Sequence, residues 1–263
     1  MPTLRVGIIT RIPTGMAMRI IPPHWTRHPA RLMGDGQPGL ALQRLLQLAS
    51  PSLPVGAFAY SEGLETAVAD GQITHVDAVA DWLRGAFTYS VVPGDLAITQ
   101  RLHTAWRAAS IDDVTTWSAR LLAMRETAER RAQERHLGHA LANLLCAMDM
   151  TEAADWRLGR AHAPAVTFAA LWALAATRWQ IAVTDSLSAM AWAWLENQVL
   201  AAVKLVPLGQ TAGQRLLFEL AGDIPAGVAR ATALSDDQLG GSLPGLAMAS
   251  AGHETLYSRL YRS

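Results

Sequence analysis

The sequence predicts an all-α fold, a single globular bundle of about ten helices. Apolar residues recur at intervals of three and four from Leu40 onward, and the alternation typical of strands is absent. Hydrophobic residues make up 51% of the 263 residues and charged residues only 17%, which is enough apolar surface for a large core. Proline and glycine clusters interrupt the helical periods at spacings suited to turns.

The first two helices are predicted from one apolar period and two breaks. A helix over about 40–49 is indicated by apolar residues at helical spacing, namely Leu42, Leu45, Leu46 and Ala49. Prolines within 50–56 end it, because proline lacks a backbone donor and disfavours helical geometry at the preceding residue. A second helix is expected over 60–69, closed by the pair Asp70-Gly71.

The next three helices are predicted from caps and inward faces. Thr74 is expected to cap the third helix, with Asp77 in its acidic first turn. The triplet Pro93-Gly94-Asp95 is expected to end it, so that Asp95 caps the fourth helix. Asp112 or Asp113 opens the fifth. The apolar positions of these three helices are Val76, Val79, Ala80, Leu83, Ala86 and Phe87, then Leu96, Leu102 and Trp106, then Val114, Trp117, Leu121 and Leu122.

Residues 125–139 are the most charged part of the chain, and such a run usually forms a solvated helix face. Glu126 and Arg130 are four residues apart, the spacing of an attractive pair on one face. Gly138 lies within this helix at a cost of about 1 kcal/mol relative to alanine. A close crossing with another helix would explain that glycine.

The following helices are more apolar. Helices over about 164–180 and 186–206, the second after a Thr184-Asp185 cap signal, are apolar on most sides and belong at the bundle centre. Neither contains the roughly 18 uncharged apolar residues of a membrane span. The break Pro207-Leu208-Gly209 precedes a helix with Leu216, Leu217 and Leu220 inward, and Ile224-Pro225 starts a short last helix to about Leu234.

We divide the chain into three parts. Residues 1–38 are arginine-containing and proline-containing with little periodicity, and we interpret them as a flexible N-terminal extension or the product of an upstream start codon. Residues 39–239 form the all-α domain. Residues 240–263 begin with a glycine-rich linker and form a C-terminal docking tail.

Composition excludes several classes of function. The net charge of +0 argues against nucleic acid or a membrane surface as partner. The single cysteine, Cys146, excludes a disulfide framework, and these features suit the cytoplasm.

The motifs of catalysis and cofactor binding are not found in the sequence. The 8 histidines include no HExxH pair, and His136 and His139 lie in an arginine-rich run that repels cations. The glycine-rich segments lack the lysine of a nucleotide-binding loop. We therefore expect no catalytic residues, no metal site and no cofactor.

The last eleven residues, HETLYSRLYRS, are unusually rich in aromatic and arginine residues for a terminal segment. Those residue types are enriched where proteins bind one another. The same composition also suits a segment that packs back on its own domain. Composition alone leaves both interpretations open.

Four segments in register resemble the UreF family of urease accessory proteins. They are 45–65 (LLQLASPSLPVGAFAYSEGLE), 121–127 (LLAMRET), 202–210 (AVKLVPLGQ) and 253–263 (HETLYSRLYRS). The resemblance extends from about Leu40 to the last residue and leaves out only 1–38. Tyr261 stands where the family customarily has phenylalanine, and Leu256 where it has glutamine.

The resemblance implies an all-α, non-catalytic homodimer that binds UreD (also called UreH) and the GTPase UreG. That assembly delivers nickel to apo-urease, and it is thought to couple delivery to GTP hydrolysis. Two other classes stay open from the residues alone. One is a helical hydrolase using scattered histidine and glutamate side chains, and the other is a generic helical interaction domain unrelated to nickel.

Two sets of residues follow from these motifs. The predicted partner-binding residues are His253, Glu254, Tyr257, Ser258, Arg259, Leu260, Tyr261, Arg262, Arg125 and Lys204. The predicted dimer or structural residues are Pro54, Gly56, Phe58, Tyr60, Ser61, Gly63, Leu64 and Glu65. Within the second set, the spacing of Phe58, Tyr60 and Leu64 favours the core over a shared surface. An arginine that acts on the GTPase would be Arg125, Arg259 or Arg262, although ion pairing suits each of them better.

Overall fold

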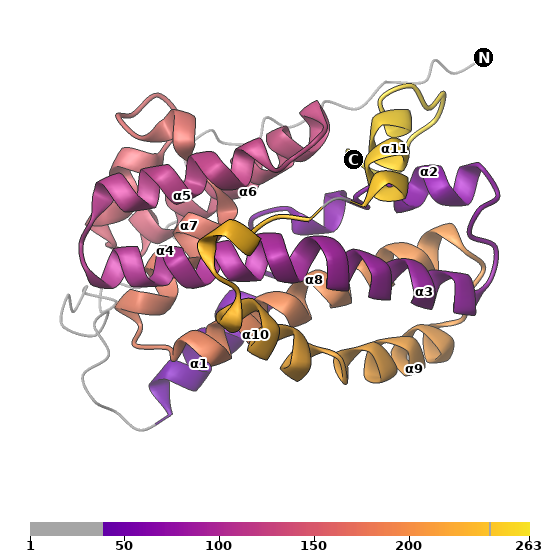
Figure 1. The fold of residues 1–263 in the computed structure, drawn as a ribbon, viewed down its shortest axis with the longest axis horizontal. Helices are drawn as coiled ribbons and strands as arrows, with labels where there is room; N and C mark the ends of the chain where they lie inside the picture. The colour runs from indigo at the N-terminus through magenta and orange to yellow at the C-terminus, as the bar shows by residue number, and fades with distance from the viewer. Residues whose placement is uncertain (1–38, 242) are drawn as a thin grey trace, which may run out of the picture.

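Eleven α-helices make up the part of the chain described by the computed structural model, residues 39–241 and 243–263, and no strand occurs within it (Figure 1). The prediction of an all-α bundle is confirmed, whereas the predicted extension over 1–38 lies outside the described residues. The helices are α1 (Leu40–Ala49), α2 (Leu64–Ala69), α3 (Val76–Ala86), α4 (Ala97–Arg107), α5 (Ile111–Ala123), α6 (Ala128–Ala147), α7 (Phe168–Arg178), α8 (Val183–Leu205), α9 (Gln210–Ala221), α10 (Ile224–Ala233) and α11 (Pro244–His253).

The centre of the bundle is formed by α7 and α8, as their composition predicts. Every residue of α7 from Ala169 to Ala176 is buried. Two buried tryptophans satisfy their indole donors here: Trp106 donates to the Ala170 carbonyl at 2.8 Å and Trp172 to the Ser186 hydroxyl at 3.0 Å. No helix within the described ranges is long and apolar enough to cross a membrane.

Gly138 of α6 lies where α6 crosses the start of α7. A Cβ atom there would come within 2.8 Å of the Thr167 carbonyl carbon. Thr167 in turn caps α7, because its hydroxyl accepts from the Ala170 backbone N–H at 3.1 Å. The predicted close helix crossing is confirmed, and only glycine fits it without displacing backbone.

The break predicted at Pro93-Gly94-Asp95 is wrong. Residues Phe87–Leu96 form a π-helical segment that joins α3 to α4, and the three run as one rod across the molecule (Figure 1). The wider π turn bonds residues five apart, as Ala97 does to Val92, and it relieves the clash of a proline ring with the preceding turn. Asp95 is therefore not a cap, and its carboxylate is used elsewhere.

Several predicted helix starts also shift. The second helix begins at Leu64 instead of residue 60, because Glu62 and Gly63 have left-handed backbone with φ of 54° and 87°. His75, not Thr74, occupies the position before α3, and the Thr74 hydroxyl contacts the His75 ring instead. Ser110 caps α5 in place of the two aspartates that follow it.

The apolar period of α1 is correct for Leu45 and Ala49, which pack against the core, but not for its other two predicted positions. Leu48 is the buried residue of the helix, while Leu42 and Leu46 are exposed. By contrast, the stripe of α3 is largely confirmed, with Val79, Leu83 and Ala86 buried. The difference shows that a period identifies a helix more securely than it identifies the covered face.

The charged run at the start of α6 is not simply a solvated face. Arg130 and Glu134 are buried, together with Leu137 and Gly138. Arg130 pairs with Glu62 at 3.3 Å, 68 residues away, and not with Glu126, which precedes the helix. The prediction failed because a partner from another motif neutralises this charge inside the fold.

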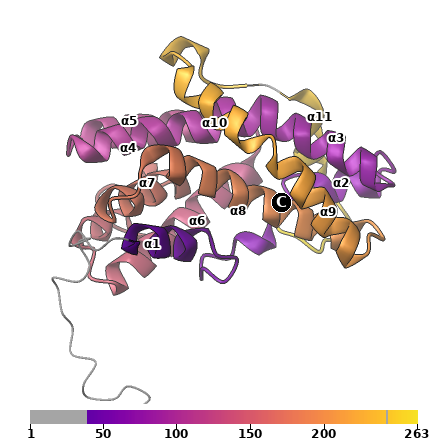
Figure 2. The same ribbon diagram turned by 90° about the horizontal axis from the view of Figure 1, so that it is seen from below.

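A helix follows the one predicted to be last. This helix, α11, comes after α10 and lies against α2 on one end of the molecule (Figures 1 and 2). The residues after α11 then run back toward the chain preceding α2. The segment expected to dock a partner is thus partly folded onto its own bundle.

Candidate functional site

The first and the last of the four sequence motifs meet in space. The Ser263 main-chain oxygen accepts from the backbone N–H of Ser61 at 2.7 Å and of Glu62 at 3.0 Å. The Ser61 hydroxyl donates to the same oxygen at 2.7 Å, and the Arg262 N–H donates to the Ala59 carbonyl at 2.8 Å. The main chain of the tail therefore packs back on its own domain.

A buried carboxylate of α2 holds the preceding turn. One oxygen of Glu65 accepts from the Leu260 N–H at 2.6 Å, and the other accepts from the Tyr261 N–H at 3.0 Å. These bonds satisfy two main-chain donors that a buried loop would otherwise leave unpaired. Glu65 thus fixes the path of the chain between residues 259 and 261.

His253 links Glu65 to α6. The imidazole is fully buried, with Nε2 3.0 Å from Glu65 and Nδ1 2.7 Å from Glu129. The ring therefore bridges two carboxylates, one on α2 and one on α6, through its two nitrogens. Glu129 also accepts from Arg259 at 2.9 Å. We call the set Glu65, Glu129, His253 and Arg259 the tail anchor.

Gly63 allows α11 to approach the tail anchor. A Cβ atom at this residue would lie 2.9 Å from the Ser250 backbone nitrogen, and its φ of 87° favours glycine as well. The Ser250 hydroxyl beside it lies 2.9 Å from the Thr127 hydroxyl at the start of α6. The glycine of the first motif is therefore required by two independent constraints.

The outer side of the tail carries apolar and basic side chains. Tyr257 is fully exposed, and Leu260 is 63% exposed although its backbone is bonded to Glu65. The remaining exposed positions of this segment are Glu254, Thr255, Ser258, Arg259 and Arg262. We call the exposed residues Tyr257, Arg259, Leu260 and Arg262 the tail surface. It is an ordered, partly apolar face, which is the kind of surface that binds another protein.

The predicted partner-binding residues thus separate into inner and outer ones. His253 and Tyr261 are buried inside the fold. Lys204 is exposed in the last turn of α8, where a cation is favourable, as predicted. The tail itself combines the two alternatives left open by its composition, since its main chain packs inward while several side chains stay exposed.

Arg125 is buried and bonded to two carboxylates. It contacts both oxygens of Asp95, and its Nη2 lies 2.8 Å from Glu134. Burial alone would lower the pKa of Arg125, but the charges and hydrogen bonds of Asp95 and Glu134 outweigh it and raise the pKa well above the ordinary value. Of the two roles considered for Arg125, ion pairing within the fold is the one that this geometry matches.

The predicted dimer or structural residues of the first motif, 45–65, also separate into buried and exposed ones. Tyr60, Ser61, Gly63, Leu64 and Glu65 are buried, while Pro54 and Phe58 are exposed and Gly56 is half-buried with a left-handed φ of 83°. The core prediction is right for Tyr60 and Leu64 and wrong for Phe58, which is 66% exposed. Phe58 lies in a separate 3₁₀ turn, Ala57–Ala59, so it is out of phase with α2.

Sequence reasoning missed Glu129, Asp95 and Glu134. Asp95 and Glu129 bond to arginines 30 and 130 residues away. Glu134 bonds to Arg125, 9 residues before it, and to the Ala169 N–H of α7, 35 residues after it, so no helical spacing connects these groups. The charged run at 125–139 was the available signal, and it was interpreted as solvated.

Within the described residues, no group of three or more histidine, cysteine, aspartate or glutamate side chains is placed to hold a metal ion. His139 is instead directed to the Trp156 carbonyl at 3.1 Å, and burial lowers its pKa.

The family model for UreF matches residues 73–221. A protein of Alkalilimnicola ehrlichii named urease accessory protein UreF is 50% identical over 229 residues, which is 87% of this chain and 99% of that protein. Proteins of the same name from Hahella chejuensis and Teredinibacter turnerae are 44% identical over 226 residues and 46% over 222, covering 100% and 98% of their own lengths.

Proposed function

Because this chain belongs to the UreF family of urease accessory proteins, we propose that it acts in urease maturation as a non-catalytic adaptor. In this role it binds UreD (UreH) and recruits the GTPase UreG, so that nickel is inserted into apo-urease. The relatives' shared name supports the link to urease. The partners, the homodimer and the adaptor role are our inference from family membership and from the geometry of the tail.

One observation carries the proposal: the tail surface is both exposed and held in place. A flexible tail would lose conformational entropy on binding, roughly 1 to 2 kcal/mol for each backbone residue that becomes ordered. Here Glu65 and His253 have already ordered the turn, so Tyr257 and Leu260 are presented without that cost. Tyrosine and arginine are also the residue types most often found at binding hot spots.

The test is co-purification with UreD. Tyr257→Ala combined with Leu260→Ala removes apolar area that the fold does not bury, so the protein is expected to stay folded and to lose UreD. Phe218→Ala is the matched control, because Phe218 is an exposed apolar residue on α9. Unchanged recovery of UreD with the double variant would contradict the proposal. Deleting the tail is a poorer test, because His253 and Tyr261 are part of the core.

Control of UreG by an arginine is a second step of the proposal. An arginine supplied in trans can stabilise the charge that develops during GTP hydrolysis. Arg259 and Arg262 are exposed on the tail surface, whereas Arg125 is enclosed by Asp95 and Glu134. We expect Arg262→Ala to slow GTP turnover in the assembled complex. Equal turnover by the Arg259→Ala and Arg262→Ala complexes and the unaltered complex would reject this role.

The homodimer calls for an apolar face outside the tail surface. Leu42 and Leu46, one turn apart on α1, are exposed and provide such a face. We expect Leu46→Glu to halve the mass measured by size exclusion with light scattering, and an unchanged mass would place the dimer contact elsewhere.

A further inference from the structure

A partly open cavity of about 140 Å³ lies beside the loop that follows α1, apart from the tail surface. Its lining comes from the end of α1 and the loop after it, the π-helical segment, α6, α7 and α8. None of the tail residues 253–263 is among the lining residues of the described chain. The proposal below therefore does not depend on how the tail functions.

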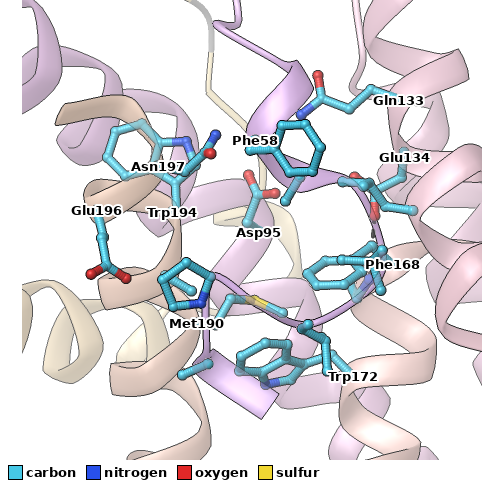
Figure 3. A pocket seen from close by; sticks show the side chains of 18 of the residues that line it. Phe58, Asp95, Gln133, Glu134, Phe168, Trp172, Met190, Trp194, Glu196 and Asn197 are labelled. Carbon is cyan, nitrogen blue, oxygen red and sulfur yellow. Dashed lines mark hydrogen bonds between the residues drawn. The ribbon is translucent and has the colours of Figure 1, made fainter. Parts of the chain in front are cut away.

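The walls of this cavity are rich in aromatic rings. Figure 3 shows Asp95 in the middle of the view, with the rings of Phe58, Phe168, Trp172 and Trp194 around it. Phe168 and Trp172 also pack on each other, with ring centroids 5.6 Å apart. Aromatic faces carry partial negative charge and attract cations, most strongly where water is excluded.

The polar floor carries an excess of negative charge. Asp95 and Glu134 are two carboxylates that share one guanidinium, that of Arg125, so these three side chains carry one net negative charge. Glu196 adds a further carboxylate to the lining (Figure 3). Glu134 is further fixed by the Ala169 backbone N–H at 3.3 Å. The neighbouring pair of Glu62 and Arg130 is balanced and contributes no net charge.

Asp95 is the member of this floor that remains open to the cavity. Its side chain is 23% exposed, against 10% for Glu134 and 7% for Arg125. Each carboxylate oxygen has a second lone pair beyond the one that faces Arg125. An incoming donor can therefore bond to Asp95 without displacing the arginine.

We propose that the cavity binds a small organic cation, namely a protonated primary amine on a short apolar stem. The ammonium donates to the Asp95 carboxylate and the stem lies against the four aromatic rings. This occupant supplies the missing positive charge and covers the apolar walls, whereas an anion would meet Asp95 and Glu134. Although several carboxylates line the cavity, no three histidine, cysteine, aspartate or glutamate side chains of the described residues are placed together to hold a bare metal ion.

The size of the cavity sets the size of the ligand. In another protein, an apolar cavity of about 150 Å³ binds benzene, which has six heavy atoms. The cavity here is of similar volume, so a stem of about four carbons with an ammonium group fits it. We therefore use n-butylamine, which is protonated at pH 7, as the probe.

The test is a titration of the full-length chain at constant ionic strength, followed by the indole N–H signals of Trp172 and Trp194 in NMR spectra. n-Butylammonium is expected to shift both signals saturably. n-Butanol, which is similar in size but uncharged, is expected to bind at least about tenfold more weakly, because a hydrogen bond to a charged group contributes about 1.5–3 kcal/mol. Butyrate should not bind. Equal binding of butanol, or no saturable shift with the amine, overturns the proposal.

Substitutions test the contribution of the Asp95 carboxylate and that of the aromatic rings separately. Asp95→Asn leaves Arg125 paired with Glu134, so we expect a folded protein with at least about tenfold weaker amine binding. Asp236→Asn is the matched control, because Asp236 bonds to Arg101 at 3.0 Å on the surface. Unchanged amine affinity in a folded Asp95→Asn protein overturns the proposal.

Phe58→Ala tests the walls without disturbing the core, because Phe58 is largely exposed. One cation–π contact contributes about 0.5–1 kcal/mol, so amine affinity should fall about two- to fivefold while butanol discrimination persists. If Asp95→Asn fails to fold, this variant and the butanol comparison still decide the matter. If Phe58→Ala leaves amine affinity unchanged, the aromatic rings do not hold the amine, and the proposed site is overturned.

Discussion

The tail anchor and the cavity floor both place carboxylates inside the bundle, but they neutralise them differently. In the tail anchor, Glu65 and Glu129 face the His253 imidazole and the Arg259 guanidinium, and main-chain N–H groups bond to Glu65 as well. In the cavity floor, Asp95 and Glu134 share only Arg125. Both sites use two acids, yet the first has two basic partners and the second has one.

This difference separates a structural use of buried charge from a binding use. The side chains of the tail anchor form their hydrogen bonds with groups of the same chain. These bonds hold the exposed tail surface in place. The cavity floor leaves Asp95 open to a cavity lined with aromatic rings (Figure 3).

The largest effect is expected from Arg125→Met. The substitution leaves Asp95 and Glu134 buried side by side without a cation, and breaking such a pair destabilises a protein by about 3–5 kcal/mol. Urea denaturation monitored by circular dichroism measures the loss. Adding Asp95→Asn should recover part of it, because one of the two charges is removed. A cost below about 1 kcal/mol for the single variant would mean that the floor does not depend on this arginine.

The next effect concerns the approach of α11 to the tail anchor. Gly63→Ala combines a left-handed φ of 87° with a Cβ only 2.9 Å from Ser250, and we expect about 3 kcal/mol of destabilisation. Gly71→Ala is the control, because its φ is 72° but no atom lies within 4 Å of the added Cβ. Only the backbone strain of about 1 kcal/mol applies there. Equal costs at the two glycines would show that the approach of α11 is not restrictive.

His253→Gln is expected to cost about 2 kcal/mol, because Glu65 and Glu129 lose the imidazole that bonds to both of them. The substitution should also make residues 254–260 sensitive to protease, because His253 no longer holds Glu65 and Glu129 beneath this turn. Limited digestion followed by mass spectrometry detects cleavage near Arg259. His75→Gln, an exposed histidine at the start of α3, serves as control. A protected turn in a His253→Gln protein would separate His253 from tail ordering.

The smallest effect should be stabilising. The Tyr261 hydroxyl is buried and has no hydrogen-bond partner among the described residues, and burial together with the charge of Glu65 raises its pKa. Tyr261→Phe removes the unpaired group and keeps the ring, so the free energy of unfolding should rise by about 1 kcal/mol. Thermal denaturation of the variant beside the unaltered chain measures it. A lowered midpoint would mean that the hydroxyl has a partner that this structure does not describe.

Much of the helical framework was predictable, because helical signals are local. Spacings of three and four residues identified the buried stripe of α3, and prolines identified the end of α8 and the start of α10. Gly138 predicted a close crossing from a single unfavourable residue. The family motifs further indicated that residues near 60 and near 260 matter, although not that they touch.

The sequence by itself therefore determined the all-α class, the approximate positions of α1 to α10 and the family, but not α11. Only the tertiary structure decided that Pro93 lies within a continuous rod, that Phe58 is exposed and that Arg125 and Arg130 are buried. A helical period depends on residues within one or two turns, whereas burial of a charge depends on a partner that lies far away in the chain. Glu62 reaches Arg130 across 68 residues and Glu65 reaches Tyr261 across 196, and no local pattern records such distances.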